Sequence, residues 1–195
     1  MDKIHEILQF WFGHLGSADL PTSDRTTLWF GENDTIKSQL LQFQEIFEQA
    51  ITSKIDDWKS TPRGCLTLII LLDQFPRHLY RNTSKAIAYD SKALELAEEG
   101  VKNKFDQSLT LIERVFFYMP FVHSEDATIQ EKSIRLYQEL VTLSMEETKQ
   151  IYQLFLAYAY AHFRMIKEFG RFPQYNKLLS RESTEAELAF LKNKT

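Results

Sequence analysis

Residues 65–75 constrain the fold more than any other part of the chain. They read CLTLIILLDQF and are apolar nearly all round, so a helix formed from them must lie inside the core. Ser60-Thr61-Pro62 precedes them in the pattern of an N-cap followed by proline at the first helical position, and Pro76 is predicted to end the helix. No apolar run of similar character could pair with this segment as a strand. The sequence therefore predicts an all-α fold.

Residues typical of helix ends recur along the rest of the chain, and we expect at least six helices. The first four expected helices, with their boundary residues, are a short one from Asp2 through Phe12 to Gly13, an amphipathic one from Asn33 or Asp34 through Ile51, one from Thr83 or Ser84 to Glu99 and Gly100, and one from Asp106 through Tyr118 to Pro120. Three more begin at Ser124 with Glu125 and Asp126 in the first turn, at a Ser144-Met145-Glu146-Glu147 capping box before a long helix ending at Gly170, and at Thr184 with Glu187.

A weak internal repeat is present. Residues 85–96 look like the second helix of a tetratricopeptide unit, with small Ala side chains that allow close helix packing. Helix pairs beginning near Pro62 and Gln107 are spaced by roughly 45 residues, against roughly 34 in the usual unit. We therefore predict a tetratricopeptide-like stack of antiparallel helical hairpins, forming a single domain over residues 1–195.

Composition excludes several classes of protein. The formal net charge is −4, so a nucleic-acid role is not expected even if Arg77, Arg81, Arg164, Arg171 and Arg181 gather near aromatic side chains. The single cysteine, Cys65, excludes an internal disulfide framework and fits a reducing compartment. No apolar run approaches the roughly 20 residues that span a bilayer, and the N-terminal residues do not read as a signal peptide. We expect a cytoplasmic protein with no membrane contact, and the sequence carries no signal for an oligomeric state.

Several short motifs together resemble the bacterial family called domain of unknown function 924. They cover almost the whole chain: Trp29-Phe30, LDQFPR at 72–77, Leu79-Tyr80-Arg81, Asp90, YMPFVHSED at 118–126, Gln130, His162, FGRFP at 169–173, Asn176, Arg181 and Ser183-Thr184. The resemblance implies a tetratricopeptide-like helical fold and no established activity. The chain departs from the family pattern at Gln174-Tyr175, where His-Arg is usual, and at Ser180, where Gly is usual. Chemistry that needs a second His-Arg pair is therefore not expected.

Asp73 is the first candidate site residue, because a carboxylate on so apolar a helix is costly to bury unless it is paired. Arg77 or Arg81 could pair with it. One interpretation is a structural clamp that fixes the turn between two helices. The other makes the arginines a fork for a carboxylate or phosphate ligand, with Asp73 holding one of them.

The remaining candidates are His123, Glu125, His162 and Arg171. Capping explains Ser124 and the acids at a helix start, but it does not call for His123. His162 lies on an apolar stripe, where a satisfied core histidine is the commoner case. Arg171, like Arg77 and Arg81, lies beside a Phe-Pro element, so we predict that the two stiff turns meet near His123 and enclose a polar pocket.

Other chemistry finds little support in the sequence. His123, Glu125 and His162 lack the spacing that puts two metal ligands on one helix face, so metal binding would need tertiary convergence, and no metal or cofactor is predicted. Cys65 opens an apolar helix with no local base, and no glycine-rich phosphate loop, nucleophile elbow or dinucleotide fingerprint occurs.

Two hypotheses about function follow. In the first, the protein is a binding module that holds a peptide or a small anionic ligand in a pocket between helices. In the second, it is an enzyme in which His123 or His162 acts as general base on an anionic small molecule. Convergence of Asp73, Arg77, His123 and His162 on one small pocket would favour the enzyme, whereas separate helix clamps would favour the binding module.

Overall fold

Helices make up the fold of the described chain, which comprises residues 2–31 and 34–193 of a computed structural model. Within these residues there is no strand, and a single isolated bridge joins Leu15 to Pro21, so the all-α prediction is confirmed. The α-helices are α1 (Lys3–Phe12), α2 (Thr26–Phe30), α3 (Asp34–Leu40), α4 (Gln44–Ile51), α5 (Pro62–Ile69), α6 (Phe75–Leu79), α7 (Asp90–Lys102), α8 (Leu111–Phe117), α9 (Met119–Val122), α10 (Ala127–Leu143), α11 (Lys149–Phe169) and α12 (Glu185–Lys192). Short 3-10 turns lie at Leu41–Phe43, Asp56–Ser60, Ser84–Ile87, Asp106–Ser108 and Pro173–Tyr175.

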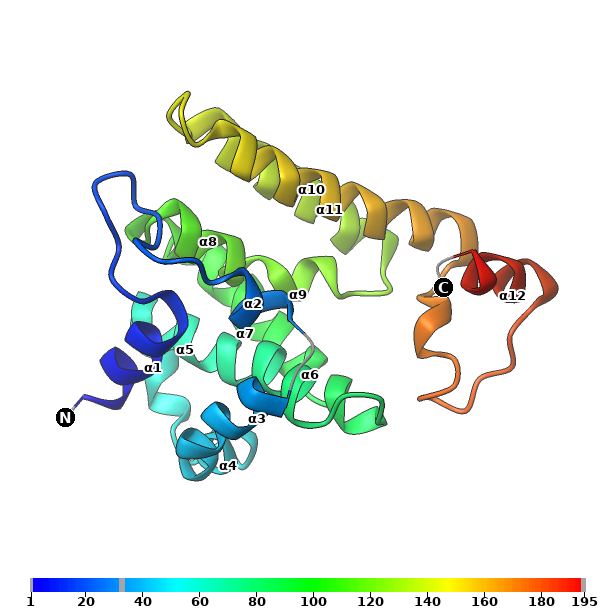
Figure 1. The fold of residues 1–195 in the computed structure, drawn as a ribbon, viewed down its shortest axis with the longest axis horizontal. Coiled ribbons are helices and arrows are strands. Elements are labelled where there is room, and N and C mark those ends of the chain that lie inside the picture. The colour runs from blue at the N-terminus through cyan, green and yellow to red at the C-terminus, as the bar shows by residue number, and fades with distance from the viewer. Residues whose placement is uncertain (1, 32–33, 194–195) are drawn as a thin grey trace.

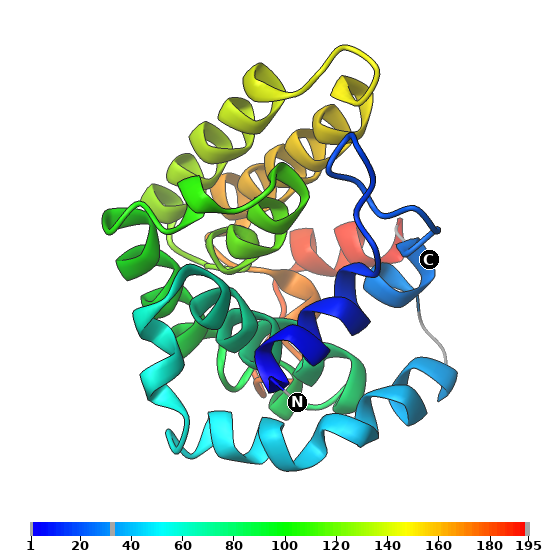
Figure 2. The same cartoon turned by 90° about the vertical axis from the view of Figure 1, so that its left-hand side faces the viewer.

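The helices lie in tiers, as Figure 1 shows. The long antiparallel pair α10 and α11 covers α8 and α9, and these rest on α5 and α7. Helices α3, α4 and α6 form the opposite side, and α1 crosses α5 (Figure 2). Helix lengths run from 4 residues in α9 to 21 in α11. This arrangement does not test the tetratricopeptide-like stack of helical hairpins, which stays a prediction.

The core forms around the predicted central helix. Every residue from 64 to 76 is buried, which confirms that this helix lies inside the core. Its neighbours are equally enclosed, since every residue from 112 to 123 is buried as well. A smaller cluster of Met165, Ile166 and Phe172 lies under the C-terminal segment. No helix of the described residues has the length and apolar character needed to cross a membrane.

Pro76 does not end the central helix, contrary to the prediction. Residues Ile70–Gln74 form a π-helical turn, in which the N–H of Phe75 bonds to the carbonyl of Ile70, and α6 continues directly. Proline lacks an N–H and its ring clashes with the carbonyl four residues earlier in a regular α-helix. The wider π turn removes that conflict, because Pro76 then stands in the first turn of a new helical segment.

Gly100 was also expected to end a helix, and it does not. It is buried inside α7, which continues to Lys102. A Cβ added at Gly100 would lie 2.4 Å from Cζ of Phe117. The residue is small because α8 passes close to α7 at this point, and no local pattern distinguishes this reason from a helix stop.

The helix caps that depend on adjacent residues were predicted correctly, whereas several predicted helix boundaries were wrong. Caps at Asp2, Gly13, Thr61, Gly170 and the Thr184–Glu187 capping box are confirmed. The helices expected to begin at Asp106, Ser124 and Ser144 instead have Thr110, Asp126 and Thr148 as their N-caps. Helix α7, expected to begin at Thr83 or Ser84, begins at Asp90 after a 3-10 turn. The helix expected to run through Ile51 is interrupted at Leu41–Phe43. Asn33 lies outside the described residues.

Candidate functional site

The π turn places Asp73 at the centre of a buried polar cluster. Asp73 is 0% exposed, and its Oδ1 lies 2.7 Å from Nδ1 of His123 and 3.6 Å from Nη2 of Arg77. The side chain of Gln74 donates to Oδ2. Single π turns inside α-helices are rare and occur often at functional sites, where they redirect one or two side chains.

Electrostatics keep Asp73 ionised in spite of its burial. Burial alone would raise the pKa of the carboxyl, but the charges of His123 and Arg77 and the hydrogen bonds outweigh it and hold the pKa below its ordinary value. An ionised carboxylate only accepts hydrogen bonds, so Nδ1 of His123 is the donor. The proton on Nδ1 leaves Nε2 as the nitrogen with which a neutral His123 can accept a proton.

The guanidinium of Arg77 is held by a second carboxylate. It makes a bidentate pair with Asp90 at the start of α7, at 3.0 and 2.9 Å, and Nη1 also donates to the carbonyl of Ala86 at 3.1 Å. Burial raises the pKa of Asp90 in spite of this pairing. Most of the N–H groups of the Arg77 guanidinium thus bond to Asp90 and Ala86, so Arg77 stabilises the fold as well as lining the site.

His162 lies near the cluster, among aromatic rings. Its Nδ1 lies 3.0 Å from the carbonyl of Tyr158, and its ring is 4.2 Å from the Tyr158 ring, 5.4 Å from that of Phe172 and 6.3 Å from that of His123. The four residues whose convergence would favour an enzyme, Asp73, Arg77, His123 and His162, are therefore brought together, with His162 in an outer position among aromatic rings.

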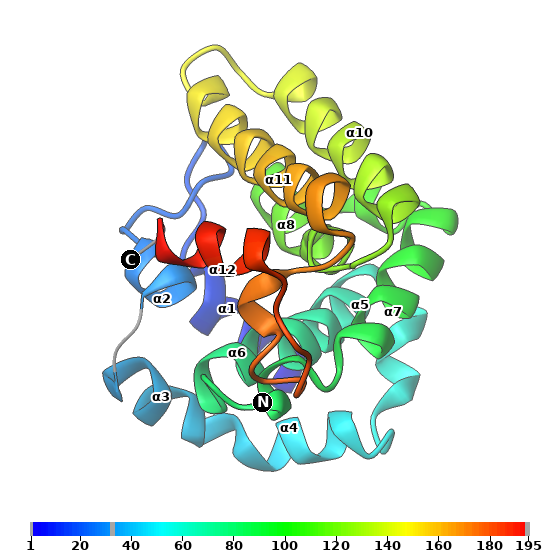
Figure 3. The same ribbon diagram turned by 90° about the vertical axis from the view of Figure 1, so that its right-hand side faces the viewer.

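Glu125 and Arg171 belong to a separate structure, which we call the C-terminal clamp. Glu125 pairs with Arg181 at 2.7 and 2.9 Å and accepts the backbone N–H of Phe172 at 2.8 Å. Arg171 pairs with Glu187 at 2.6 and 2.9 Å. The Glu125 contacts join the segment that follows α11 to the start of α10, and the Arg171–Glu187 pair joins it to α12. Figure 3 shows this segment running from α11 to α12. The guanidinium of Arg171 is thus held by Glu187, and the pocket expected between the Arg77 and Arg171 turns stays a prediction.

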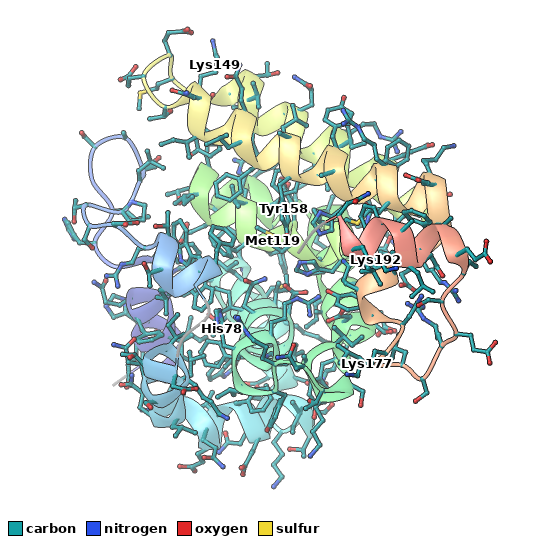
Figure 4. All side chains as sticks on the ribbon, turned by 45° about the vertical axis from the view of Figure 1, so that its right-hand side comes forward. His78, Met119, Lys149, Tyr158, Lys177 and Lys192 are labelled. Atoms are coloured by element: carbon teal, nitrogen blue, oxygen red, sulfur yellow. The ribbon has the colours of Figure 1, made fainter. Side chains whose placement is uncertain are left out.

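Beside the Asp73 cluster lies a hollow of about 230 Å³, which we call the basic pocket. Its polar lining residues are Gln74, Arg77, His78, Arg81 and His123, and its walls are Trp29, Phe30, Met119 and Tyr158. Figure 4 shows Tyr158, Met119 and His78 lying one below another between α11 and α6. Among the described residues no Asp or Glu lines this pocket.

Sequence reasoning missed His78 and the aromatic walls. Burial, with a smaller contribution from Arg81, lowers the pKa of His78 to about 4, so its ring is neutral near pH 7 and can donate a hydrogen bond. The one signal in the sequence that could have indicated His78 is its place between Arg77 and Arg81. Arg81 donates from Nη2 to the carbonyl of Gly31 at 3.1 Å, which joins α6 to the end of α2.

A second hollow, of about 330 Å³, lies on the other side of His123. Asp90, Glu125 and Tyr175 are among its lining residues, so its charge is less suited to an anion than that of the basic pocket. No group of three or more His, Cys, Asp or Glu side chains is arranged to hold a metal ion within residues 2–31 and 34–193.

Fold and site together define an all-helical protein built around a buried carboxylate–imidazole–guanidinium cluster. The chain belongs to the family described as bacterial protein of unknown function (DUF924), whose model matches residues 7–195. This match confirms the resemblance seen in the sequence. The chain is also similar to a solved structure, the protein of unknown function ATU0120 from Agrobacterium tumefaciens, with 32% identity and a TM-score of 0.76 over 85% of this chain and 88% of the other. No curated protein matches the chain.

Proposed function

We propose that this protein binds a small anionic ligand, a carboxylate or a phosphate, in the basic pocket between α2, α6, α9 and α11. The observation that carries the proposal is the lining itself. Two guanidinium groups, two imidazoles and one amide face one hollow, while the neutralising carboxylates Asp73 and Asp90 are not among its lining residues. Hydrogen bonds from cationic donors to an ionised acceptor are the stronger kind, and a planar guanidinium matches a carboxylate or phosphate in shape.

The size of the pocket favours a small ligand over a peptide. Sites for drug-sized ligands usually have volumes of about 300–1,000 Å³, and the basic pocket has about 230 Å³. A single carboxylate or phosphate group with a few further atoms fits such a volume. The held geometry of Arg77 and His123 reduces the side-chain ordering that binding would otherwise require.

Thermal unfolding in the presence of phosphate and succinate tests the proposal. Binding to the native state alone raises the melting temperature in a saturable way, so both anions should do so beyond the effect of sodium chloride at equal ionic strength. Arg81→Met should remove the shift. Arg135→Met, which removes an exposed charge from α10 outside the pocket, should keep it. Equal behaviour of the two variants, or no saturable shift, would contradict the proposal.

The Asp73–His123 pair favours a second candidate, an enzyme that uses His123 as general base. A buried carboxylate that fixes Nδ1–H of a histidine is the arrangement that orients catalytic imidazoles in many hydrolases. His162, the other candidate base, does not line the basic pocket. Nuclear magnetic resonance of small carboxylate and phosphate esters incubated with the protein would detect product formation. Product from the native protein and from Arg135→Met, but not from His123→Gln, supports the enzyme; ligand binding without product leaves binding alone.

We also infer a cytoplasmic location, which the single reduced cysteine, Cys65, supports.

A further inference from the structure

An apolar groove lies beside the basic pocket. It has a volume of about 550 Å³, and its apolar lining includes Leu20, Pro21, Ile112, Ile151, Leu154 and Phe155. The last three share one face of α11 with Tyr158, at helical spacing. Leu154 is 67% exposed, which is unusual for so large an apolar side chain on a face that also carries exposed Ile151 and Tyr158.

The groove and the basic pocket form one continuous surface. Trp29, Phe30 and Tyr158 line both hollows. The rings of Phe30 and Phe155 are 6.2 Å apart, so α2 and α11 meet at the boundary. Phe30 is 49% and Tyr158 39% exposed, which leaves their rings open to a molecule that lies across them.

The described lining residues of the groove carry no net charge. The two charged ones, Asp24 and Arg25, are opposite in sign, and the Asp24 carboxylate accepts the backbone N–H and the hydroxyl of Thr26, at 2.8 and 2.6 Å. The basic pocket is lined by Arg77 and Arg81 and by no described Asp or Glu, so positive charge lies on one side of the aromatic boundary and a mostly apolar surface on the other. A ligand that matches this surface carries an anionic group at one end and an apolar chain at the other.

We propose that the ligand is a small amphiphile, whose carboxylate or phosphate head occupies the basic pocket and whose alkyl chain lies across Phe30 and Tyr158 into the apolar groove. This inference rests on the proposed function, because it assigns the head to the same pocket. The groove supplies the apolar area that a 230 Å³ pocket alone cannot offer. Each methylene buried in the groove tightens binding by about fourfold.

Isothermal titration calorimetry with butyrate, hexanoate, octanoate and decanoate, each below its micelle-forming concentration, tests the inference. We expect the dissociation constant to fall by roughly fourfold per added methylene until the groove is filled. Octyl phosphate measured beside octanoate shows which head is preferred. Octanol, which has the chain without the charge, should bind at least tenfold more weakly than octanoate.

Three variants separate the head from the chain. Leu154→Ser changes a largely exposed side chain, so the fold should tolerate it, and it should weaken decanoate by roughly fivefold while leaving butyrate unchanged. Arg81→Met should weaken every carboxylate in the series. Arg135→Met, outside both hollows, should match the native protein.

Several results would overturn the inference. Butyrate binding without chain-length dependence would leave the proposed function standing and refute the amphiphile, whereas no binding of any carboxylate or of octyl phosphate would refute both. Octanol binding as tightly as octanoate would show an apolar site that ignores charge. Self-association that is abolished by Leu154→Ser, or co-sedimentation with phosphatidylglycerol vesicles in place of decanoate binding, would assign the groove to a second copy or to a membrane.

Discussion

Nδ1 of His123 lies 2.7 Å from Oδ1 of Asp73, although 50 residues separate them in the chain. Asp73 belongs to the π turn after α5, and His123 is the residue that follows α9. The pair therefore joins the central helix to the other fully buried segment, residues 112–123. Both side chains are almost completely buried, so this contact contributes to the stability of the core as well as to the candidate site.

Replacing Asp73 should cost much of that stability. Asp73→Asn removes the negative charge that faces Arg77 and His123, and loss of one partner from a buried charged pair typically costs about 3–5 kcal/mol. Urea unfolding at pH 7 measures the effect. Asp57→Asn changes an exposed carboxylate and should shift the free energy of unfolding by no more than about 0.5 kcal/mol. Equal effects of the two variants would show that the cluster is not a stabilising one.

The same carboxylate should make stability depend on acid pH. Its pKa in the folded protein lies below the unfolded value, which is about 3.9 for Asp. The stabilisation is therefore complete above the unfolded pKa and is lost as pH falls through the folded one. Urea unfolding between pH 6 and pH 3 should show a fall in the free energy of unfolding below about pH 4. A curve for Asp73→Asn parallel to that of the native protein would contradict this assignment.

Gly100→Ala should destabilise the protein even though alanine favours helices. The gain in helix propensity is about 1 kcal/mol, but a Cβ would lie 2.4 Å from Cζ of the buried Phe117 and 3.3 Å from Sγ of Cys65. Overpacking of a filled core costs about 1–3 kcal/mol, so we expect a net loss of about 1 kcal/mol in thermal or urea unfolding. A double variant with Phe117→Leu, which makes room, should be less affected by the alanine than the native background. Stabilisation by Gly100→Ala alone would mean that α7 and α8 are not in close contact.

Local signals in the sequence predicted the parts of the fold that depend on neighbouring residues. The caps at Asp2 and Thr184 form within three residues, so their pattern is visible in the chain. Pro76 and Gly100 misled because their roles depend on a π turn and on Phe117, and neither can be inferred from adjacent residues. Asp126, not Ser124, caps α10, since the backbone enters the helix two residues later than expected.

Pairing of site residues was predictable only over one helical turn. Asp73 and Arg77 were placed together from their spacing, and the two are in contact. The partners that decide what the site can do are distant in sequence, such as Asp90 for Arg77 and Arg181 for Glu125. The arginines beside the two Phe-Pro elements suggested a single anion pocket. Tertiary packing, however, decides whether a guanidinium faces a ligand or a carboxylate of the protein.

Cys65 should be inert toward alkylation in the folded protein. Burial, with a smaller contribution from Glu99, raises the pKa of its thiol to about 12, so almost no thiolate is present at pH 8. Iodoacetamide should therefore leave the native protein unmodified and label it fully in urea, as mass spectrometry would show. Rapid native labelling would contradict the burial of this helix start.

Ser180→Gly should stabilise the protein. Ser180 is exposed and has a φ of 53°, a left-handed conformation that costs a residue with a side chain about 1–2 kcal/mol. Glycine adopts it freely, although part of the gain is lost to its larger unfolded-state entropy. We expect a net gain of about 0.5 kcal/mol in thermal unfolding. Ser108→Gly is the matched control, because this exposed serine lacks a positive φ and its replacement should give no gain. A gain of the same size in the control would assign the effect to the unfolded chain.

The C-terminal clamp gives the last prediction, which concerns local opening. Glu125 holds the segment after α11 by two bonds from Arg181 and one from the Phe172 N–H. Burial alone would raise the pKa of Glu125, but the Arg181 and Phe172 bonds lower it, so the carboxylate is ionised near neutral pH. The pair is partly exposed, with 33% and 22% of the two side chains accessible, so solvent screening limits its contribution to about 1 kcal/mol.

Glu125→Gln should therefore speed amide exchange in residues 170–192 by roughly fivefold, while exchange in α5 and α8 stays unchanged. Hydrogen exchange followed by mass spectrometry measures both regions at once. Glu98→Gln removes a looser pair with Lys132, at 3.5 Å on α7 and α10, and should leave residues 170–192 unaffected. Arg181→Met should match Glu125→Gln, and the double variant should be little worse than either single change, because both remove the same interaction. Additive effects of the two changes would show that Glu125 and Arg181 hold the segment through different partners.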